Sequence, residues 1–219
     1  MGIIKRGILG GVSNKIGNVV GSSWKGIATL RSLPLSVANP NTYSQRQNRN
    51  SFALFSKLGS QVLSTVCQPL WNRDAKQMSG FNAYVMDNKR AYDEDPEAWA
   101  ANPIMSKGRL SSKLLTCSYV TINSVLTVSW DETLINPADD NSDLAYIQII
   151  SVNTTNPASP TYSAIGYANV IARSAGSVSL AGVPNRPESG KFIVSLSFKS
   201  EDGREVATNS SMSIDFPQA

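Results

Sequence analysis

The chain has 219 residues, enough for one large domain or two small ones, and it contains no histidine. The absence of histidine excludes histidine-dependent triads and histidine-based metal sites. Enzymes that use a serine–lysine or carboxylate pair stay open on composition alone.

Positive and negative side chains divide unevenly along the chain. Residues 1–113 hold fifteen Lys and Arg against six Asp and Glu, whereas residues 114–219 hold five against ten. The first 73 residues carry nine basic side chains and no acidic one. Such a division predicts two regions with different surroundings. A basic region favours an acidic protein surface or a nucleic acid as its neighbour.

Neither a membrane partner nor a disulfide framework is predicted. No stretch reaches about 18 uninterrupted apolar residues, and glycines break the start of the chain where a signal peptide needs an apolar run. We therefore expect a protein made in the cytoplasm. Cys67 and Cys117 lack the spacing of metal ligands and are expected to be free, buried or half-buried thiols, although a single bridge between them stays open.

Residues 1–43 are predicted to form a basic, glycine-rich extended arm and a linker. Seven glycines interrupt the first 35 residues, and the segments between them alternate apolar and polar side chains as strands do. We interpret the segment as an arm or hairpin that becomes ordered on another surface. Strand alternation puts Trp24 and Leu30 on one face and Lys25 and Arg31 on the other. A phosphate-binding loop is not expected, because Ile27 stands where "GSSWKG" would need a following lysine.

The arm and the start of the next helix carry the residues expected to bind a partner. Glycines there permit bends and close backbone approach, apolar side chains anchor, and cations meet an acidic surface. A strand of this kind can join the sheet edge of a partner protein. The same cations can instead contact phosphates while aromatic side chains stack on bases, so nucleic acid stays open as the alternative. The predicted partner-binding residues are Lys15, Gly17, Gly21, Trp24, Lys25, Gly26, Leu30, Arg31, Arg46 and Arg49.

Residues 44–113 are predicted to form a small helical region. Thr42 or Ser44 can cap a first helix, and Pro69 is expected to end it. A second helix is predicted from about Ser79 to Arg90. The apolar positions at helical spacing in the first helix are Phe52, Phe55, Leu58, Val62, Leu63 and Val66.

A short third helix is predicted after the second one. Asp95 is its expected N-cap, and Pro96 occupies its first position. Acidic side chains favour helix N-termini. We therefore interpret Glu94, Asp95 and Glu97 as helix-end residues and expect no catalytic cluster there.

Residues 114–219 are predicted to form an immunoglobulin- or fibronectin-like antiparallel β-sandwich. Segments 120–130, 144–152 and 192–200 alternate, turn signals separate them, and six or seven strands fit within about 105 residues. Trp130, at the end of "LTVSW", is typical of the strand tryptophan in such folds, and the missing cysteine pair favours the fibronectin-like variant. The predicted fold class is therefore α+β.

One acidic segment, "ADDNSDL" (138–144), begins like an EF-hand calcium loop. Leu144 stands where that loop needs glycine, and Ile150 stands in the place of its final glutamate. We therefore expect an acidic, solvent-facing loop between two strands. Neither a metal site nor a cofactor site is predicted.

The run "GILGGVSNKIGNVVGSSWKGIATLRSLP", followed by "QRQNRNSFAL", resembles an uncharacterised family found in Bacteroidota and their phages. That family is catalogued as a numbered domain of unknown function, and the resemblance covers nearly the whole chain. Its occurrence in crAss-like phages implies a non-enzymatic virion structural protein, on the capsid, at the head–tail connection or in the tail. The implied partners are other virion subunits in many copies, with packaged DNA as a further contact. The resemblance implies no catalytic residue and no small-molecule substrate.

Overall fold

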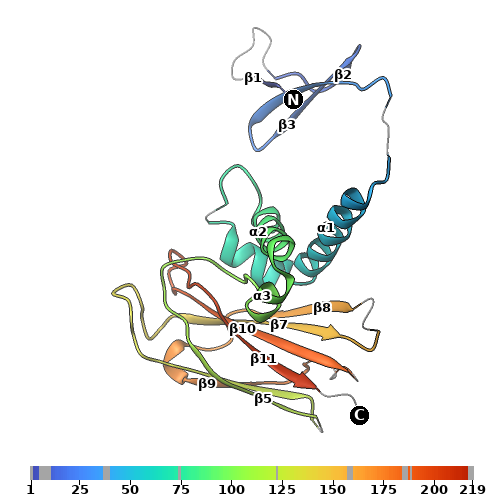
Figure 1. Cartoon of the computed structure of the whole chain (residues 1–219). Helices are drawn as coiled ribbons and strands as arrows, with labels where there is room; N and C mark the ends of the chain where they lie inside the picture. Colours follow the sequence, from blue (N-terminus) through green and yellow to red (C-terminus); the bar gives the residue numbers. More distant parts are fainter. Residues whose placement is uncertain are drawn as a thin grey trace. The chain divides into compact units, whose positions relative to one another are not determined.

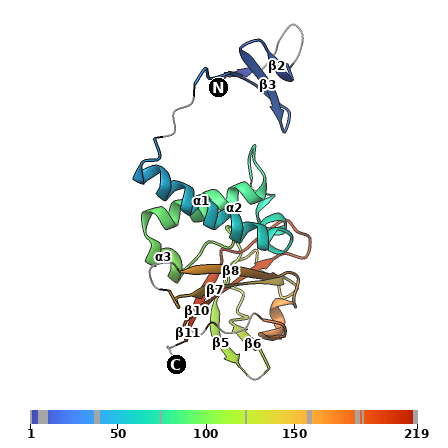
Figure 2. The ribbon, with the colours of Figure 1, turned by 90° about the vertical axis from the view of Figure 1, so that its right-hand side faces the viewer.

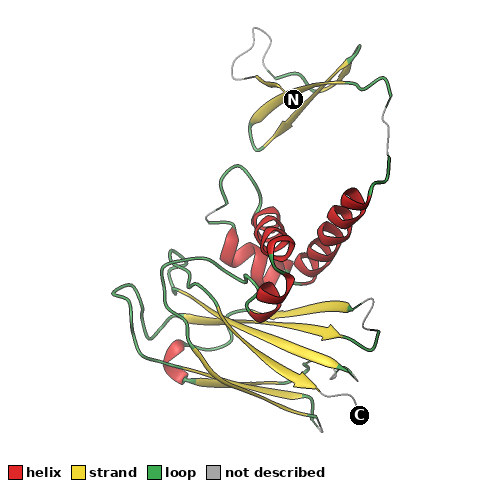
Figure 3. Cartoon of the chain, viewed as in Figure 1, coloured by secondary structure: helices red, strands yellow, loops and turns green. Residues whose placement is uncertain are grey.

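The computed structural model describes residues 2–4, 11–36, 40–73, 75–121, 123–156, 160–183, 187 and 189–216. The chain splits into two compact units, Met1–Arg46 and Gln47–Ala219. Helices and three antiparallel sheets make up the described residues (Figures 1 and 3), so the predicted α+β class is confirmed. The helical region and the C-terminal strands belong to the same unit.

The first unit contains a four-stranded antiparallel sheet with the strand order β1-β4-β3-β2. Its strands are β1 (Gly2–Ile4), β2 (Asn14–Ile16), β3 (Val19–Trp24) and β4 (Ile27–Ser32). The sequence predicts an extended arm whose strand pairs with a partner's sheet, whereas these strands pair with one another. We call residues 11–36 the basic sheet, because Lys15, Lys25 and Arg31 lie in it without an acidic residue.

Two tight turns fold the basic sheet back on itself. Lys25 and Gly26 both have a positive φ, 46° and 80°, which is the conformation that a two-residue type I′ hairpin turn requires. Gly17 opens the preceding β2–β3 turn with a φ of 57°. Glycine adopts this region of φ without the steric cost that a Cβ atom brings.

A series of helices follows the basic sheet, and all of it except the first four residues of its first helix belongs to the second unit. These are α1 (Tyr43–Gln61), the π-helical turn η1 (Leu63–Trp71), α2 (Gly80–Glu94) and α3 (Pro96–Ala101). Thr42 caps α1 as predicted, because its hydroxyl accepts from the Gln45 N–H and the Gln45 side chain accepts from the Thr42 N–H, each at 3.3 Å. Ser79 caps α2 and Asp95 caps α3, which confirms both predicted starts.

The prediction that Pro69 ends the first helix is wrong. Helical turns continue through Pro69 to Trp71, in the wider π form, where the Cys67 N–H bonds the Val62 carbonyl at 3.1 Å. Proline removes one backbone donor from the turn. Burial of Val66, Leu70 and Trp71 in this stretch outweighs that loss.

The seven strands described after residue 113 form two antiparallel sheets. One has the order β5-β6-β9, with β5 (Leu114–Val120), β6 (Val125–Trp130) and β9 (Ser177–Leu180). The other has the order β11-β10-β7-β8, with β7 (Leu144–Asn153), β8 (Thr161–Tyr167), β10 (Gly190–Lys199) and β11 (Ser210–Phe216). Segment 120–130 is therefore not one strand, because a turn near Ser124, whose φ is 49°, divides β5 from β6.

Strands β7 and β10 are buried on both faces. Ile147 and Ile149 of β7 belong to the core shared with β5, β6 and β9, whereas Ile150 and Val152 belong to the core shared with the helices. This alternation follows the two-residue period of a strand. The central sheet therefore lies between the helices on one side and the β5-β6-β9 sheet on the other (Figure 2).

Candidate functional site

The strand register of the basic sheet brings its cations onto one face. Lys15 of β2 lies opposite Val20 of β3, and Val20 lies opposite Arg31 of β4. Directly opposed residues of antiparallel strands project from the same face. Trp24 follows Val20 by four residues, so it shares this face and is 56% exposed. We call Lys15, Val20, Trp24 and Arg31 the basic face.

Leu30 lies on the opposite face of the sheet. It pairs with Gly21, whereas Trp24 pairs with Ile27, so the prediction that Trp24 and Leu30 share a face is wrong. The two-residue turn after Trp24 reverses the chain and shifts the alternation by one position. Gly21 approaches the backbone closely, since a Cβ atom there would lie 2.1 Å from the Val12 carbonyl oxygen.

Two of the three remaining predicted cations lie on helix α1. Arg46 and Arg49 are exposed and stand three residues apart, so they are neighbours on the helix surface. Lys25 occupies the exposed β3–β4 turn. The basic face therefore unites Lys15, Trp24 and Arg31 alone among the predicted partner-binding residues.

The acidic segment 138–144 does not form the predicted solvent-facing loop. Asp139 is 8% exposed and Asp143 is fully buried, while only Asp140 of the three aspartates is exposed. Their counter-ion is Arg173, itself fully buried. An ionised carboxylate loses hydration on burial, so it needs a charged or hydrogen-bonding partner.

Arg173 organises this buried charge cluster. Its guanidinium lies 3.1 Å from the Asp143 carboxylate, 3.5 Å from that of Asp139 and 2.9 Å from the Ser111 carbonyl oxygen. The guanidinium carbon stands 4.1 Å from the centre of the Phe198 ring. The Arg173 carbonyl accepts the indole N–H of Trp130 at 2.8 Å. The cluster therefore ties η2 (Arg173–Ala175) to β6 and β10.

The two buried carboxylates respond to this environment in opposite ways. Burial works against ionisation of Asp139, but hydrogen bonds from Ser111 and Asn136 and the charge of Arg173 outweigh it, so its pKa lies below the usual value. Burial raises the pKa of Asp143 above its usual value, although the hydrogen bond from the Asp140 N–H and the charge of Arg173 act to lower it. Asp139 is thus the firmly ionised member of the cluster.

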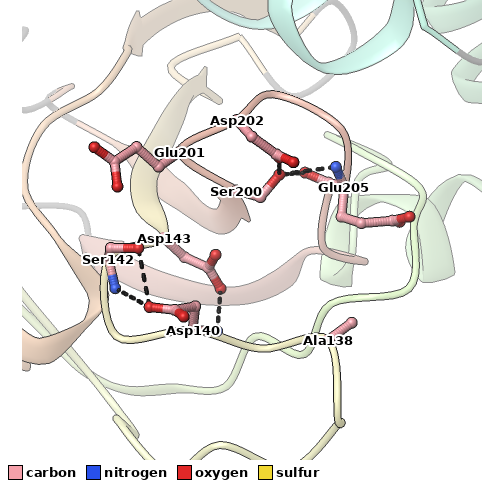
Figure 4. Close-up of a pocket in the computed structure, with 8 residues that line it drawn as sticks. All are labelled: Ala138, Asp140, Ser142, Asp143, Ser200, Glu201, Asp202 and Glu205. Carbon is pink, nitrogen blue, oxygen red and sulfur yellow. Dashed lines mark hydrogen bonds between the residues drawn. The ribbon is translucent and has the colours of Figure 1, made fainter.

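An acidic pocket of about 480 Å³ lies beside this cluster, between the chain segments 138–143 and 200–205 (Figure 4). Asp143 joins it to the buried charges. No set of three or more Asp, Glu or Cys side chains in the described part of the chain is placed to hold one metal ion. The carboxylates that line the pocket are Asp140, Asp143, Glu201, Asp202 and Glu205.

The other predicted features behave as helix-end and core residues. The Asp95 carboxylate accepts from the N–H groups of Glu97 and Ala98 at 3.0 Å, which confirms its capping role. Cys67 and Cys117 are free thiols, buried and half-buried as predicted, and burial raises the pKa of each to about 12.

Sequence reasoning missed Arg173. It stands 30 residues after Asp143 in the chain, in a segment without other charge, and only the fold brings it to the aspartates. The available signal was three aspartates within five residues, more than a single turn needs for its own hydrogen bonds.

A family model described as "Family of unknown function (DUF6266)" matches residues 10–213. No curated protein matches the chain. Within the described residues, the helices are all too short or too polar to cross a membrane.

Proposed function

The chain belongs to the DUF6266 family, and we propose that it is a non-enzymatic structural component of a phage virion, which docks on neighbouring subunits through its basic sheet. It would act as a capsid auxiliary, head–tail connection or tail protein, present in several copies per particle. The resemblance of its N-terminal run to proteins of Bacteroidota phages motivates the setting.

The observation that carries the docking proposal is the basic face. Lys15 and Arg31 flank Val20 in one row across three strands, and the exposed Trp24 lies further along the same face. Tryptophan and arginine are enriched among the residues that dominate protein interfaces. Lys15 and Arg31 place two positive charges on this face, one on each side of Val20, and an acidic partner surface complements them.

We further propose that the C-terminal strands are a fibronectin-like sandwich. The first, second and fifth of the seven strands form one sheet, and the third, sixth and seventh form the other, with the fourth beside the third. This order agrees with an immunoglobulin-type arrangement that has an extra edge strand. Trp130 is buried between the sheets, 5.8 Å from the Phe198 ring, which supports the assignment.

Charge reversal on the basic face tests the docking proposal. We expect Lys15→Glu/Arg31→Glu to remove the chain from purified phage particles, because both substitutions replace attraction by repulsion toward an acidic partner. The measurement is the amount of chain per particle, by quantitative mass spectrometry. Lys57→Glu/Lys76→Glu makes the same charge change at exposed positions outside the basic sheet and is expected to leave incorporation unchanged. Absence of the unmodified chain from the particles would refute the proposal.

Nucleic acid is the second candidate partner, favoured by the exposed Trp24 beside cations. That function requires binding of DNA at about 50 mM salt, with affinity that falls steeply as salt is added. An electrophoretic mobility assay with the purified chain separates the candidates. Binding that Lys15→Glu/Arg31→Glu abolishes favours nucleic acid, whereas no binding at this salt concentration eliminates it.

A further inference from the structure

We propose that the acidic pocket receives a lysine or arginine side chain from the basic sheet of a second copy of this chain. The inference rests on the proposed docking function and names the surface on which the basic sheet docks. The occupant of the pocket is then a cationic protein side chain, and the contact joins the copies head to tail.

The pocket contains carboxylates that form no ion pair with the cations of the described residues. Glu205 pairs with Arg73 at 3.4 Å and Asp202 pairs with Arg204 at 3.4 Å. None of the ion pairs found among the described residues includes Asp140 or Glu201, although both line the pocket. The pocket therefore keeps a negative potential after its internal pairs are counted.

A second observation points to an incoming hydrogen-bond donor. Asp143 is fully buried, and its Oδ2 atom accepts from the Asp140 N–H at 3.0 Å and meets Arg173. Asp143 is one of the residues that line the pocket, and its other oxygen, Oδ1, is buried without a hydrogen-bond partner among the described groups. In Figure 4 this oxygen points toward the space below Ser200 and Glu205. A buried acceptor without a partner is costly, so a donor inserted into the pocket gains the missing bond.

The shape and lining of the pocket select the class of occupant. Its volume of about 480 Å³ falls in the range of about 300–1,000 Å³ that is usual for ligand sites. The spread of its carboxylates does not converge on a single ion within the described residues. An ammonium group offers three donors and a guanidinium offers five, all without an acceptor, which suits several separated carboxylates.

Charge complementarity identifies the source of the cation. The first 73 residues contain nine basic side chains and no acidic one, and Lys15, Lys25 and Arg31 are exposed on the basic sheet. The basic sheet and the acidic pocket are different surfaces of the chain. A contact between the basic sheet of one copy and the acidic pocket of another is therefore heterologous. Heterologous contacts generate rings when they close and filaments when they stay open, which suits a component present in many copies.

Reversed charges on the two surfaces test the proposal with the full chain. Lys15→Glu/Arg31→Glu makes the basic sheet acidic, and Asp140→Lys/Glu201→Lys makes the pocket basic. We expect each variant alone to self-associate about thirtyfold more weakly than the unmodified chain, as loss of a paired charge at an interface commonly does. An equimolar mixture is expected to associate again, because each acidic sheet then meets a basic pocket and each basic sheet an acidic pocket. Sedimentation velocity at about 50 mM salt, where screening is weak, measures the association.

Controls separate charge pairing from misfolding and from bulk charge. Glu201→Lys alone changes a side chain with no hydrogen bond or ion pair among those described, and it is expected to weaken association while the urea midpoint stays unchanged. Glu132→Lys/Asp215→Lys makes the same charge change at exposed positions outside the pocket and is expected to leave association unchanged. A chain that stays monomeric at every concentration overturns the proposal, as does a mixture that fails to associate. If Lys15→Glu/Arg31→Glu blocks incorporation into particles while the pocket variants do not, the pocket inference fails and the docking function stands.

Discussion

Replacement of Arg173 by methionine is expected to lower the free energy of unfolding by about 3–5 kcal/mol, the usual cost of removing one partner of a buried ion pair. The guanidinium is fully buried between Asp139 and Asp143. Methionine fills much of the volume over the Phe198 ring but supplies no charge or donor. Two carboxylates are then left without their cation, and the Ser111 carbonyl loses its bond at 2.9 Å.

Urea unfolding at neutral pH measures this loss. Arg204→Met is the matched control, because the Arg204 side chain is 84% exposed in its pair with Asp202, and we expect a change of about 0.5 kcal/mol or less. Asp143→Asn added to Arg173→Met is expected to recover part of the loss, since it removes one unpaired charge. An Arg173→Met variant as stable as the original chain would show that the cluster does not hold η2 in place.

The deficit of Arg173→Met is also expected to shrink as the pH falls. Arg173 stabilises the ionised carboxylates and so holds down their folded-state pKa. Removal of Arg173 raises each folded-state pKa. The resulting loss of unfolding free energy is present at pH values above the pKa values of the carboxyls in the unfolded chain. Protonation at lower pH removes the penalty. The difference in unfolding free energy between the two chains is therefore largest near neutrality.

Replacement of Trp99 by alanine is expected to lower the free energy of unfolding by about 3–5 kcal/mol, through loss of buried area and a cavity. Its ring packs edge-on against Phe55, Tyr92 and Tyr162, with ring centres 5.0, 5.5 and 6.2 Å away. The indole N–H donates to the Asn88 side chain at 2.8 Å. Trp99 thereby ties α3 to α1, α2 and β8.

Two further variants separate the contributions to the destabilisation by Trp99→Ala. Trp99→Phe keeps most of the ring packing, and Asn88 still accepts the Ile104 N–H at 3.1 Å, so we expect a loss of about 1–3 kcal/mol. Trp24→Ala removes a 56% exposed ring from the other unit and is expected to leave the unfolding of residues 47–216 unchanged. Equal stability of Trp99→Ala and Trp24→Ala would contradict the assignment of Trp99 to the core.

Local chemistry explains which elements could be predicted. Thr42, Ser79 and Asp95 act through hydrogen bonds within three residues of themselves. The sequence predicts Asp95 as a cap, offers Thr42 beside Ser44 as the cap of the first helix, and places the start of the second helix near Ser79. The alternation of apolar side chains in the sequence predicts strands β7 and β10. Phe52 has helical spacing yet is 56% exposed, because spacing defines a stripe without specifying which part of it the neighbouring elements cover.

Features that depend on the reversal of the chain could not be predicted in the same way. The faces of Trp24 and Leu30 follow from a turn at Lys25 and Gly26 that the alternation alone does not locate. Burial of Asp139 and Asp143 depends on Arg173, which only the packing of the two C-terminal sheets brings near. The first feature depends on the position of a local turn, and the second depends on long-range packing.

The proposed function requires that the basic sheet contacts another subunit in the assembled particle. Lysine acetylation followed by mass spectrometry reports this contact directly, because Lys15 and Lys25 lie in the sheet whereas Lys57 and Lys76 are exposed outside it. We predict that Lys15 and Lys25 are modified in the dilute, isolated chain and protected in purified particles. Lys57 then serves as the reference for accessibility. Equal modification of Lys15 and Lys25 in both states would contradict the claim.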